Sequence, residues 1–260
     1  MFEMNENVLL DNFQAKGNTF EGLKEVIEGL TNITKFMKWK SGDIDILSYV
    51  GRTTVDVEKK DQYGNVLTSP QTGEVLVDKI PVVSSILLTP GNLPSRHLNV
   101  PVDTLQKGYR ENSVKTPELL AEWTEYSKLA FIFNDSTDVN TKRKFYLASA
   151  NALQTMDRFD MKGRFLTEPS LERDSIIAKQ FEKDLGVTVI ARSVNGTSKI
   201  FSILSDKYCH INQNSLFDIV KAIEKDSEMG EAKCYLWEVS NFFTKLYIEF
   251  PKKAEELSML

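Results

Sequence analysis

The dipeptide Asn195-Gly196, with an apolar run on each side, constrains this chain more than any other feature. Asn-Gly readily adopts the two positive φ angles of a type I′ turn, which joins two antiparallel strands. Apolar residues alternate with others over 187–192, and residues 200–204 are mostly apolar. We therefore expect a β-hairpin that ends at a short polar run, Ser205-Asp206-Lys207-Tyr208.

The composition indicates a folded protein that does not enter a membrane. The chain has 260 residues, of which 41% are hydrophobic and 27% charged, enough for one large core or two modest ones. No apolar run approaches the length of about 18 residues that a membrane helix needs. Glu3, Glu6 and Asp11 stand where a secretory leader would carry Lys or Arg. The sequence therefore predicts a cytoplasmic location in the host cell.

Cysteine and histidine are too scarce for the commonest kinds of metal or disulfide chemistry. The chain has Cys209 and Cys234, without CxxC spacing, and the histidines His97 and His210. Cys209 and His210 are adjacent, and neighbours on an extended chain point to opposite faces. Phosphate-binding glycine loops, HExxH and GxSxG are also missing. We expect no metal, no cofactor and no catalytic residues, and hence a protein that is not an enzyme.

The first half of the chain predicts a helix and then strands. Apolar residues recur at three and four residue spacing over 19–38, after a capping box that starts at Asn18. Between 43 and 88 the period changes to two, which predicts an antiparallel meander with Pro81 at an edge or a bulge. Residues 89–115 contain three prolines and predict a connecting loop.

The second half alternates between predicted helices and strands. Helices are expected from Thr116 to about 130, from Asn140 or Thr141 to 153, from Ser170 to 185, and from Asn212 or Asn214 to 223. Two strands follow at 232–239 and 243–250. The predicted fold is therefore α+β: an N-terminal meander, a central Asn-Gly hairpin and a C-terminal hairpin, packed with four to five helices. The expected lobes are 1–100 and 116–260, or else one continuous domain.

Positive charge concentrates in one region of an acidic chain. The net charge is −5, but residues 142–210 hold 12 Lys and Arg against 8 Asp and Glu, which leaves −9 for the rest. Such a region can face phosphates, and scattered solvated charges would give the same count. The candidate nucleic-acid-binding residues are Lys142, Arg143, Lys144, Arg158, Lys162, Arg164, Arg192, Lys199, Lys207 and Tyr208.

The polar run after the hairpin allows two interpretations. Asp206 and Lys207 could form an acid–base pair in a buried site, with the Tyr208 hydroxyl as a donor. Alternatively, Asp206 caps a turn and Tyr208 packs its ring on the hairpin. The residue types alone favour the second interpretation.

Two stretches, ALQTMDRFDMKGRFLT and the hairpin with its following helix, carry a family resemblance. The chain there resembles the phage/plasmid-like domain-of-unknown-function family, over about 145–250. The matching pattern is an Arg strand, a turn, an apolar strand, an LSD-x-Y run and an Asn-containing cap. The motif positions are Arg192, Leu204, Ser205, Asp206, Tyr208 and Asn212. The resemblance implies a gene of a phage or mobile element, without an established activity.

These observations lead to two main functional hypotheses, and an enzyme that uses Asp206, Lys207 and Tyr208 ranks after them as a third. The first is a DNA-associated accessory protein that binds nucleic acid, such as a single-strand annealing or replication factor. The second is a phage-encoded protein that binds and inhibits a host or defence protein. The expected partners are single-stranded DNA in the first case and a host or phage protein in the second. The sequence leaves the oligomeric state open.

Overall fold

The computed structural model describes residues 4–101, 117–133, 144–150, 152, 170–208, 214–225 and 230–251. Within them the fold is α+β, as predicted, with four α-helices and strands in two sheets. None of the helices in these ranges is long and apolar enough to cross a membrane.

The chain forms two compact units that are not contiguous in sequence. Unit 1 comprises Met1–Trp39, Ser149–Asp160 and Gly186–Leu260, and unit 2 comprises Lys40–Ala148 and Met161–Leu185. These boundaries differ from the predicted lobes 1–100 and 116–260. The difference arises because the first strand of the chain pairs near its C-terminal end, which a reading of local patterns does not reveal.

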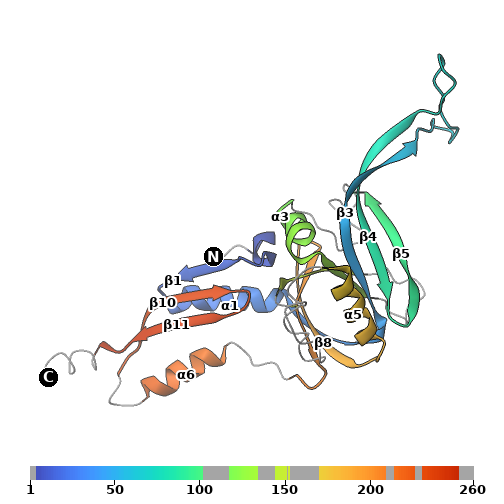
Figure 1. The fold of residues 1–260 in the computed structure, drawn as a ribbon. Helices are drawn as coiled ribbons and strands as arrows, with labels where there is room; N and C mark the ends of the chain where they lie inside the picture. Colours follow the sequence, from blue (N-terminus) through green and yellow to red (C-terminus); the bar gives the residue numbers. More distant parts are fainter. Residues whose placement is uncertain are drawn as a thin grey trace. The chain divides into compact units, whose positions relative to one another are not determined.

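Unit 1 contains a three-stranded antiparallel sheet with the order β1-β10-β11. Helix α1 contacts β1 and β10, and lies behind the three strands in Figure 1. A second group of strands in this unit has the order β2-β8-β9. The elements of unit 1 are η1 (Glu6–Leu9), β1 (Gln14–Gly17), α1 (Phe20–Ile33), β2 (Thr34–Lys40), β8 (Gly186–Val194), β9 (Thr197–Ser205), α6 (Ser215–Glu224), β10 (Lys233–Ser240) and β11 (Thr244–Glu249).

Strands β8 and β9 pair antiparallel around Asn195 and Gly196, whose φ angles are 50° and 82°. Every residue of β9 except Ser205 is buried, including the polar ones. Contacts from α1 to β8, and from η1 to both strands, contribute to this burial. The ribbon is therefore an interior element of unit 1.

The predicted helix over 19–38 is too long. Helix α1 ends at Ile33, and its cap is Thr19, whose hydroxyl accepts the N–H of Gly22, rather than Asn18. From Thr34 the chain continues as β2. Residues 34–40 alternate between more and less exposed positions, and their aromatic and β-branched members favour a strand.

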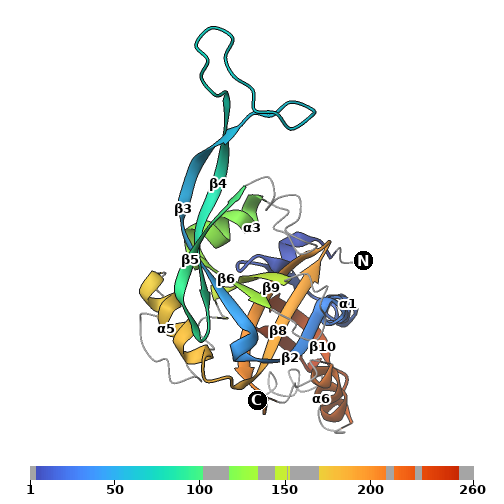
Figure 2. The ribbon, with the colours of Figure 1, turned by 90° about the vertical axis from the view of Figure 1, so that its right-hand side faces the viewer.

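Unit 2 is built on strands in the order β7-β6-β3-β4-β5 (Figures 1 and 2). Helix α5 covers one face, where Phe181 stacks on Phe131 at 6.3 Å. On the other face Trp123 of η3 lies 6.0 Å from Tyr49. The elements are η2 (Ser41–Asp43), β3 (Ile44–Glu58), β4 (Val77–Thr89), β5 (Asn92–Pro101), α3 (Pro117–Ala121), the π-helical turn η3 (Glu122–Ser127), β6 (Leu129–Phe133), β7 (Lys144–Ala148) and α5 (Leu171–Phe181).

Three predictions for unit 2 are wrong. Residues 92–101, predicted as loop, form β5, and residues 129–130, predicted as helix, belong to β6. Residues 144–148, predicted within a helix, form β7 and pair with β6. A short apolar run does not distinguish a strand from a buried helix by spacing, and here pairing with β6 decides.

Candidate functional site

Most of the predicted nucleic-acid-binding cations lie outside the described residues. This holds for Lys142, Arg143, Arg158, Lys162 and Arg164. Lys144 is the first residue of strand β7, whereas the sequence predicted it at the start of a helix. The structure describes its backbone but not its side chain. These residues remain predicted binding residues.

Arg192 is an interior residue, not a surface cation. Its Nε donates to Thr34 Oγ1 at 3.2 Å, and its Nη1 donates to Asn241 Oδ1. The guanidinium also lies 4.7 Å from the centre of the Phe201 ring. Burial lowers the pKa of Arg192 to about 10, which leaves it charged at neutral pH. The prediction that it faces phosphate is therefore wrong, because β8 is covered.

Lys199 is buried as well, with 1% of the residue exposed. Its Nζ lies 2.7 Å from Asp11 Oδ1, and 5.8 Å from the centre of the Phe201 ring. Asp11 also accepts the N–H of Ala150 at 2.9 Å. Two cations thus flank one aromatic ring inside unit 1, and a carboxylate neutralises one of them. Lys199 stabilises the fold and offers no phosphate site.

The polar run after β9 forms a turn. Ser205, Asp206 and Lys207 are exposed, and Tyr208 is half-buried. The Tyr208 N–H donates to Ser205 O at 3.0 Å, and the Asp206 carbonyl accepts from Lys38 Nζ at 2.6 Å. Exposed side chains at 206 and 207 do not make a buried acid–base site. Asn212, the last motif residue, lies outside the described residues.

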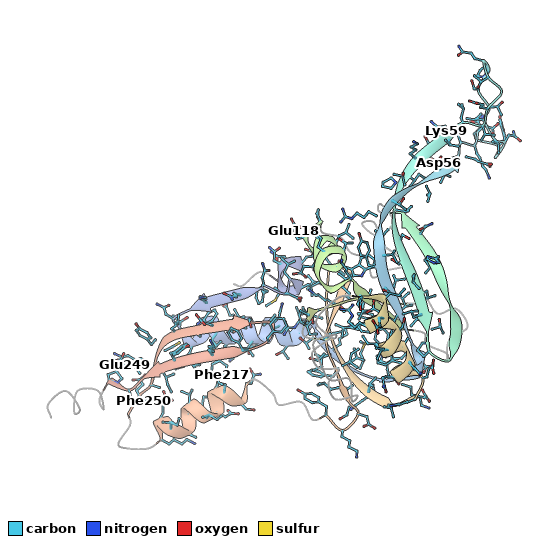
Figure 3. All side chains as sticks on the ribbon, viewed as in Figure 1. Asp56, Lys59, Glu118, Phe217, Glu249 and Phe250 are labelled. Atoms are coloured by element: carbon cyan, nitrogen blue, oxygen red, sulfur yellow. The ribbon has the colours of Figure 1, made fainter. Side chains whose placement is uncertain are left out.

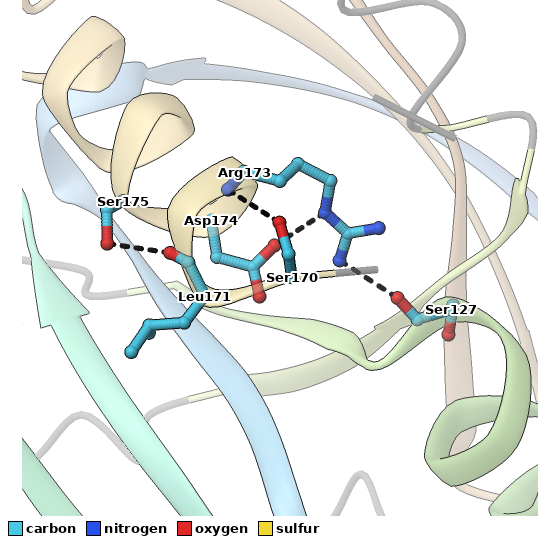
Figure 4. Close-up of polar contacts among 6 residues, drawn as sticks. All are labelled: Ser127, Ser170, Leu171, Arg173, Asp174 and Ser175. Carbon is cyan, nitrogen blue, oxygen red and sulfur yellow. Dashed lines mark hydrogen bonds and ion pairs between the residues drawn. The ribbon is translucent and has the colours of Figure 1, made fainter. Parts of the chain in front are cut away.

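A buried ion pair in unit 2 escaped the sequence analysis. Arg173 Nε lies 2.7 Å from Asp174 Oδ1, and Arg173 Nη2 donates to Ser127 O at 3.0 Å (Figure 4). Burial raises the pKa of Asp174, which the charge of Arg173 partly offsets. The sequence signal is the spacing of Arg173 with Ile177 and Phe181, which places it on the inner face of α5. The pair anchors α5 and is not open to a ligand.

The outer half of the β3–β4 ribbon is the most unusual surface of unit 2, and we call residues 50–81 the arm. Strand β3 pairs with β6 over Ile44–Ser48, and β4 pairs with β5 from Val82 onward. Farther out, among the described residues, β3 and β4 pair with each other alone. Figures 1 and 2 show the arm extending past the other strands of unit 2.

The two faces of the arm differ in chemistry. Directly opposed residues in an antiparallel pair share a face. Val55 opposes Ile80, and Val57 follows two residues later on the same side. Val57 is 43% exposed, yet this face continues inward to the buried Val82. The other face carries Asp56 opposite Lys79 and Glu58 opposite Val77. We call the first of these the apolar face, although Asp78, opposite Val57, also lies on it, and it continues the side of the sheet on which Val82 is buried.

The tip of the arm is ordered by side-chain-capped turns. Asp61 Oδ1 accepts the N–H groups of Tyr63 and Asn65 at 2.8 and 2.9 Å, and Asp61 Oδ2 accepts from the Asn65 amide. A second turn forms where Ser69 accepts the N–H groups of Gln71 and Thr72. Tyr63 is 80% exposed. Further exposed apolar residues of the tip are Val66, Leu67, Val75, Leu76 and Val77.

The arm carries charges of both signs. Lys59 Nζ lies 2.8 Å from Asp78 Oδ1, and Asp56 opposes Lys79 across the ribbon. Figure 3 shows the side chains around Asp56 and Lys59 standing clear of the other elements of unit 2. The arm holds four Lys and Arg against five Asp and Glu. The arm therefore presents exposed apolar side chains without a surplus of positive charge.

The sequence contains a signal for the arm. Val55 and Val57 alternate with polar residues, which is typical of a strand with one buried face. The pattern does not say that the covering element is missing. A second signal is Pro81, which marks an edge or a bulge and stands within a predicted strand that is longer than most.

Unit 1 has a groove of about 540 Å³ between α1 and α6. Its walls combine two aromatic rings with charges of both signs: Phe20, Glu21, Lys24, Glu28, Asn214, Phe217, Asp218 and Lys221. Of α6, Val220 alone is buried. In the part of the chain that the structure describes, no group of three or more His, Cys, Asp or Glu could hold a metal ion.

Comparison of the chain with family models, with curated proteins and with solved structures finds no match. The resemblance to the phage/plasmid-like family therefore stays a prediction. Any function has to follow from the chain's own residues and geometry.

Proposed function

We propose that this protein acts by binding another protein, without catalysing a reaction, and that the arm is its contact surface. The observation that carries the proposal is a β-ribbon whose two edges and apolar face have no cover among the described residues.

Three physical effects favour a protein partner. A two-stranded ribbon by itself is marginally stable in water. Free strand edges present unpaired N–H and C=O groups, which readily pair with another chain. Exposed clusters of apolar side chains mark interaction sites, and those of the tip add to Val55, Val57 and Ile80. A partner that covers the apolar face and adds a strand to the ribbon would stabilise the ribbon, pair its free edge and bury its apolar side chains.

The charges of the arm argue for a protein over nucleic acid. Phosphate binding needs a surplus of Lys and Arg, and the arm has none. The partner we infer presents an apolar groove beside a strand edge, so that its backbone joins the ribbon. In the context that the family resemblance implies, it is a host or phage protein, and binding would inhibit or recruit it.

The proposal is tested by site-specific capture followed by measurement of affinity. A photo-crosslinking amino acid replaces Val57 or Tyr63, and in a control Glu182, the exposed residue that caps the C-terminal end of α5. The captured protein is then purified, and its binding to the intact chain is measured by calorimetry. We expect capture from the arm positions and weak capture from position 182.

Matched variants separate the two faces of the arm. Val55→Glu with Val57→Glu places charge on the apolar face and should abolish binding. Asp56→Ala with Glu58→Ala alters the opposite face and should leave binding unchanged. Equal loss in both pairs, or equal capture at position 182, would overturn the proposal. So would light scattering that shows a dimer dissociated by the Val55 and Val57 substitutions, because the occupant would then be a second copy of this chain.

A further inference from the structure

The sheet of unit 1 has one covered and one open face. Trp237 and Val239 are buried on the side of α1, and Trp237 Nε1 donates to Thr19 O at 2.9 Å. A Cβ on Gly17 would lie 2.4 Å from the Trp237 ring, so this contact requires glycine. The register places Leu246 opposite Trp237 and hence on the same side. The alternate residues of β10 and β11 must face the other way.

Lysine and aromatic residues gather on that other side, which we call the open face. Glu238 opposes Lys245 and also Lys16, and Leu236 opposes Tyr247. Lys233 opposes Glu249 at the end of the sheet. Tyr247 is 46% exposed. Tyr235, which a β-bulge inserts between Cys234 and Leu236, has no partner in the register, and we assign it to this face because it is 71% exposed while α1 covers the other face.

A central carboxylate holds two of the lysines in place. Lys16 Nζ lies 2.9 Å and Lys245 Nζ 3.9 Å from the Glu238 oxygens. The hydrogen bond from Lys16, followed by the charges of both lysines, lowers the pKa of Glu238. Lys245 Nζ also lies 4.6 Å from the centre of the exposed Phe243 ring. The open face thus carries three lysines against Glu238 and Glu249, a surplus of one positive charge.

We propose that the open face binds single-stranded nucleic acid, independently of the arm. Every base has a π-face that stacks on an aromatic ring, and Tyr247 and Tyr235 supply two rings. Lys16, Lys233 and Lys245 lie on the same face by register, and would contact the backbone phosphates of the same strand. Neighbouring strands are about 4.8 Å apart, so a three-stranded sheet is about 10 Å wide and holds a few nucleotides.

The outer face of a sheet favours a single strand over a duplex. Paired bases are stacked inside a duplex and expose only their edges, so rings on a sheet reach them poorly. The site contains none of the ten residues that the sequence predicted for nucleic acid, and it lies in unit 1, whereas the arm lies in unit 2. The nucleic-acid hypothesis and the protein hypothesis therefore have separate surfaces and can fail separately.

The test measures fluorescence anisotropy of labelled oligo(dT) and oligo(U) with the full chain, at several salt concentrations. A short duplex of the same length is the comparison probe. Each single-strand phosphate contact adds about −0.7 to the slope of log affinity against log salt, so three lysines give about −2. Tyr247→Ala and Tyr235→Ala should each weaken binding at least about fivefold, since stacked bases are lost. Tyr247→Phe should retain it.

Two controls keep the outcome interpretable. Tyr63→Ala removes a tyrosine that is more exposed still, but on the arm, and should leave binding unchanged. Lys16→Gln with Lys245→Gln should bring the slope about 1.4 closer to zero while the melting temperature holds. No binding at low salt would overturn the proposal. So would binding that survives both tyrosine variants but is lost on changing Lys142, Arg143 and Lys144 to Ala, or equal binding of the duplex.

Discussion

The β8–β9 ribbon and the arm are both antiparallel pairs with a glycine in a left-handed turn, Gly196 at φ 82° and Gly64 at φ 88°. In the first, Lys199 and Arg192 are buried, whereas in the second Val57 is exposed. The mostly apolar β8–β9 ribbon thus keeps two cations inside, and the mostly polar arm leaves a valine outside. Burial of a single side chain is set by the elements that pack on it, more than by its own polarity.

The largest expected difference in the free energy of unfolding is between the loss of a buried ion pair and the loss of an exposed one. Asp11→Ala removes a carboxylate partner of the buried Lys199 and should lower the free energy of unfolding by about 3 kcal/mol. Asp78→Ala removes the exposed partner of Lys59 on the arm and should change it by at most about 0.5 kcal/mol. Urea denaturation measures both. Equal effects would mean that the β8–β9 ribbon is not sealed from water.

The next effect compares two valines. Val189 on β8 is fully buried, so Val189→Ala should lower the free energy of unfolding by about 2 kcal/mol through lost packing and a residual cavity. Val57→Ala on the arm should lower it by less than about 0.5 kcal/mol. The same denaturation assay applies. A large loss for Val57→Ala would show that the arm is covered after all.

The two turn glycines give a smaller difference. An L-residue in a left-handed conformation costs about 1 kcal/mol, so Gly196→Ala should lower the free energy of unfolding by that amount. Gly64→Ala carries the same backbone penalty, but a ribbon that opens locally should confine it to the arm. Hydrogen exchange should therefore show faster exchange in the arm and no change in the rest of unit 2. Global destabilisation by Gly64→Ala would contradict the comparison.

The smallest effect is a local response to acid. Hydrogen bonds from Asn65, first from its side chain and then from its backbone, lower the pKa of Asp61 below the ordinary 3.8. A carboxylate with a lowered folded pKa stabilises its turn above pH 3.8, and this stabilisation is lost as the pH falls through the folded pKa. Amide exchange at 63–65 should then accelerate without global unfolding. In Asp61→Asn the pH dependence should vanish.

Features that depend on local chemistry could be predicted from the sequence. The α+β class follows from periodicity, and the sequence predicts Ser170 as a helix cap, where its hydroxyl accepts the N–H of Arg173 at 3.0 Å. The start of α1 was located to within a residue, because Thr19 and Asn18 are both good caps.

Features that depend on residues distant in sequence could not be predicted. Lys144 begins a strand because β6 is available to pair with it, and nothing near Lys144 in sequence encodes that. Arg192 and Lys199 look like surface cations until Thr34, Asn241 and Asp11 are brought to them from the two ends of the chain. The open face combines Lys16 with residues more than 200 positions later. Spacing along the sequence carries no information about contacts between residues so far apart.

The pairing of β1 with β10 has a consequence for synthesis of the chain. Strand β1 can pair with β10 only after Trp237, the partner of Gly17, has left the ribosome. At about 5–20 residues per second, the 220 residues from Asn18 to Trp237 take about 11–44 s to translate. During that time the first helix has no finished sheet to shelter its apolar side, so the nascent chain should depend on chaperones until translation is nearly over.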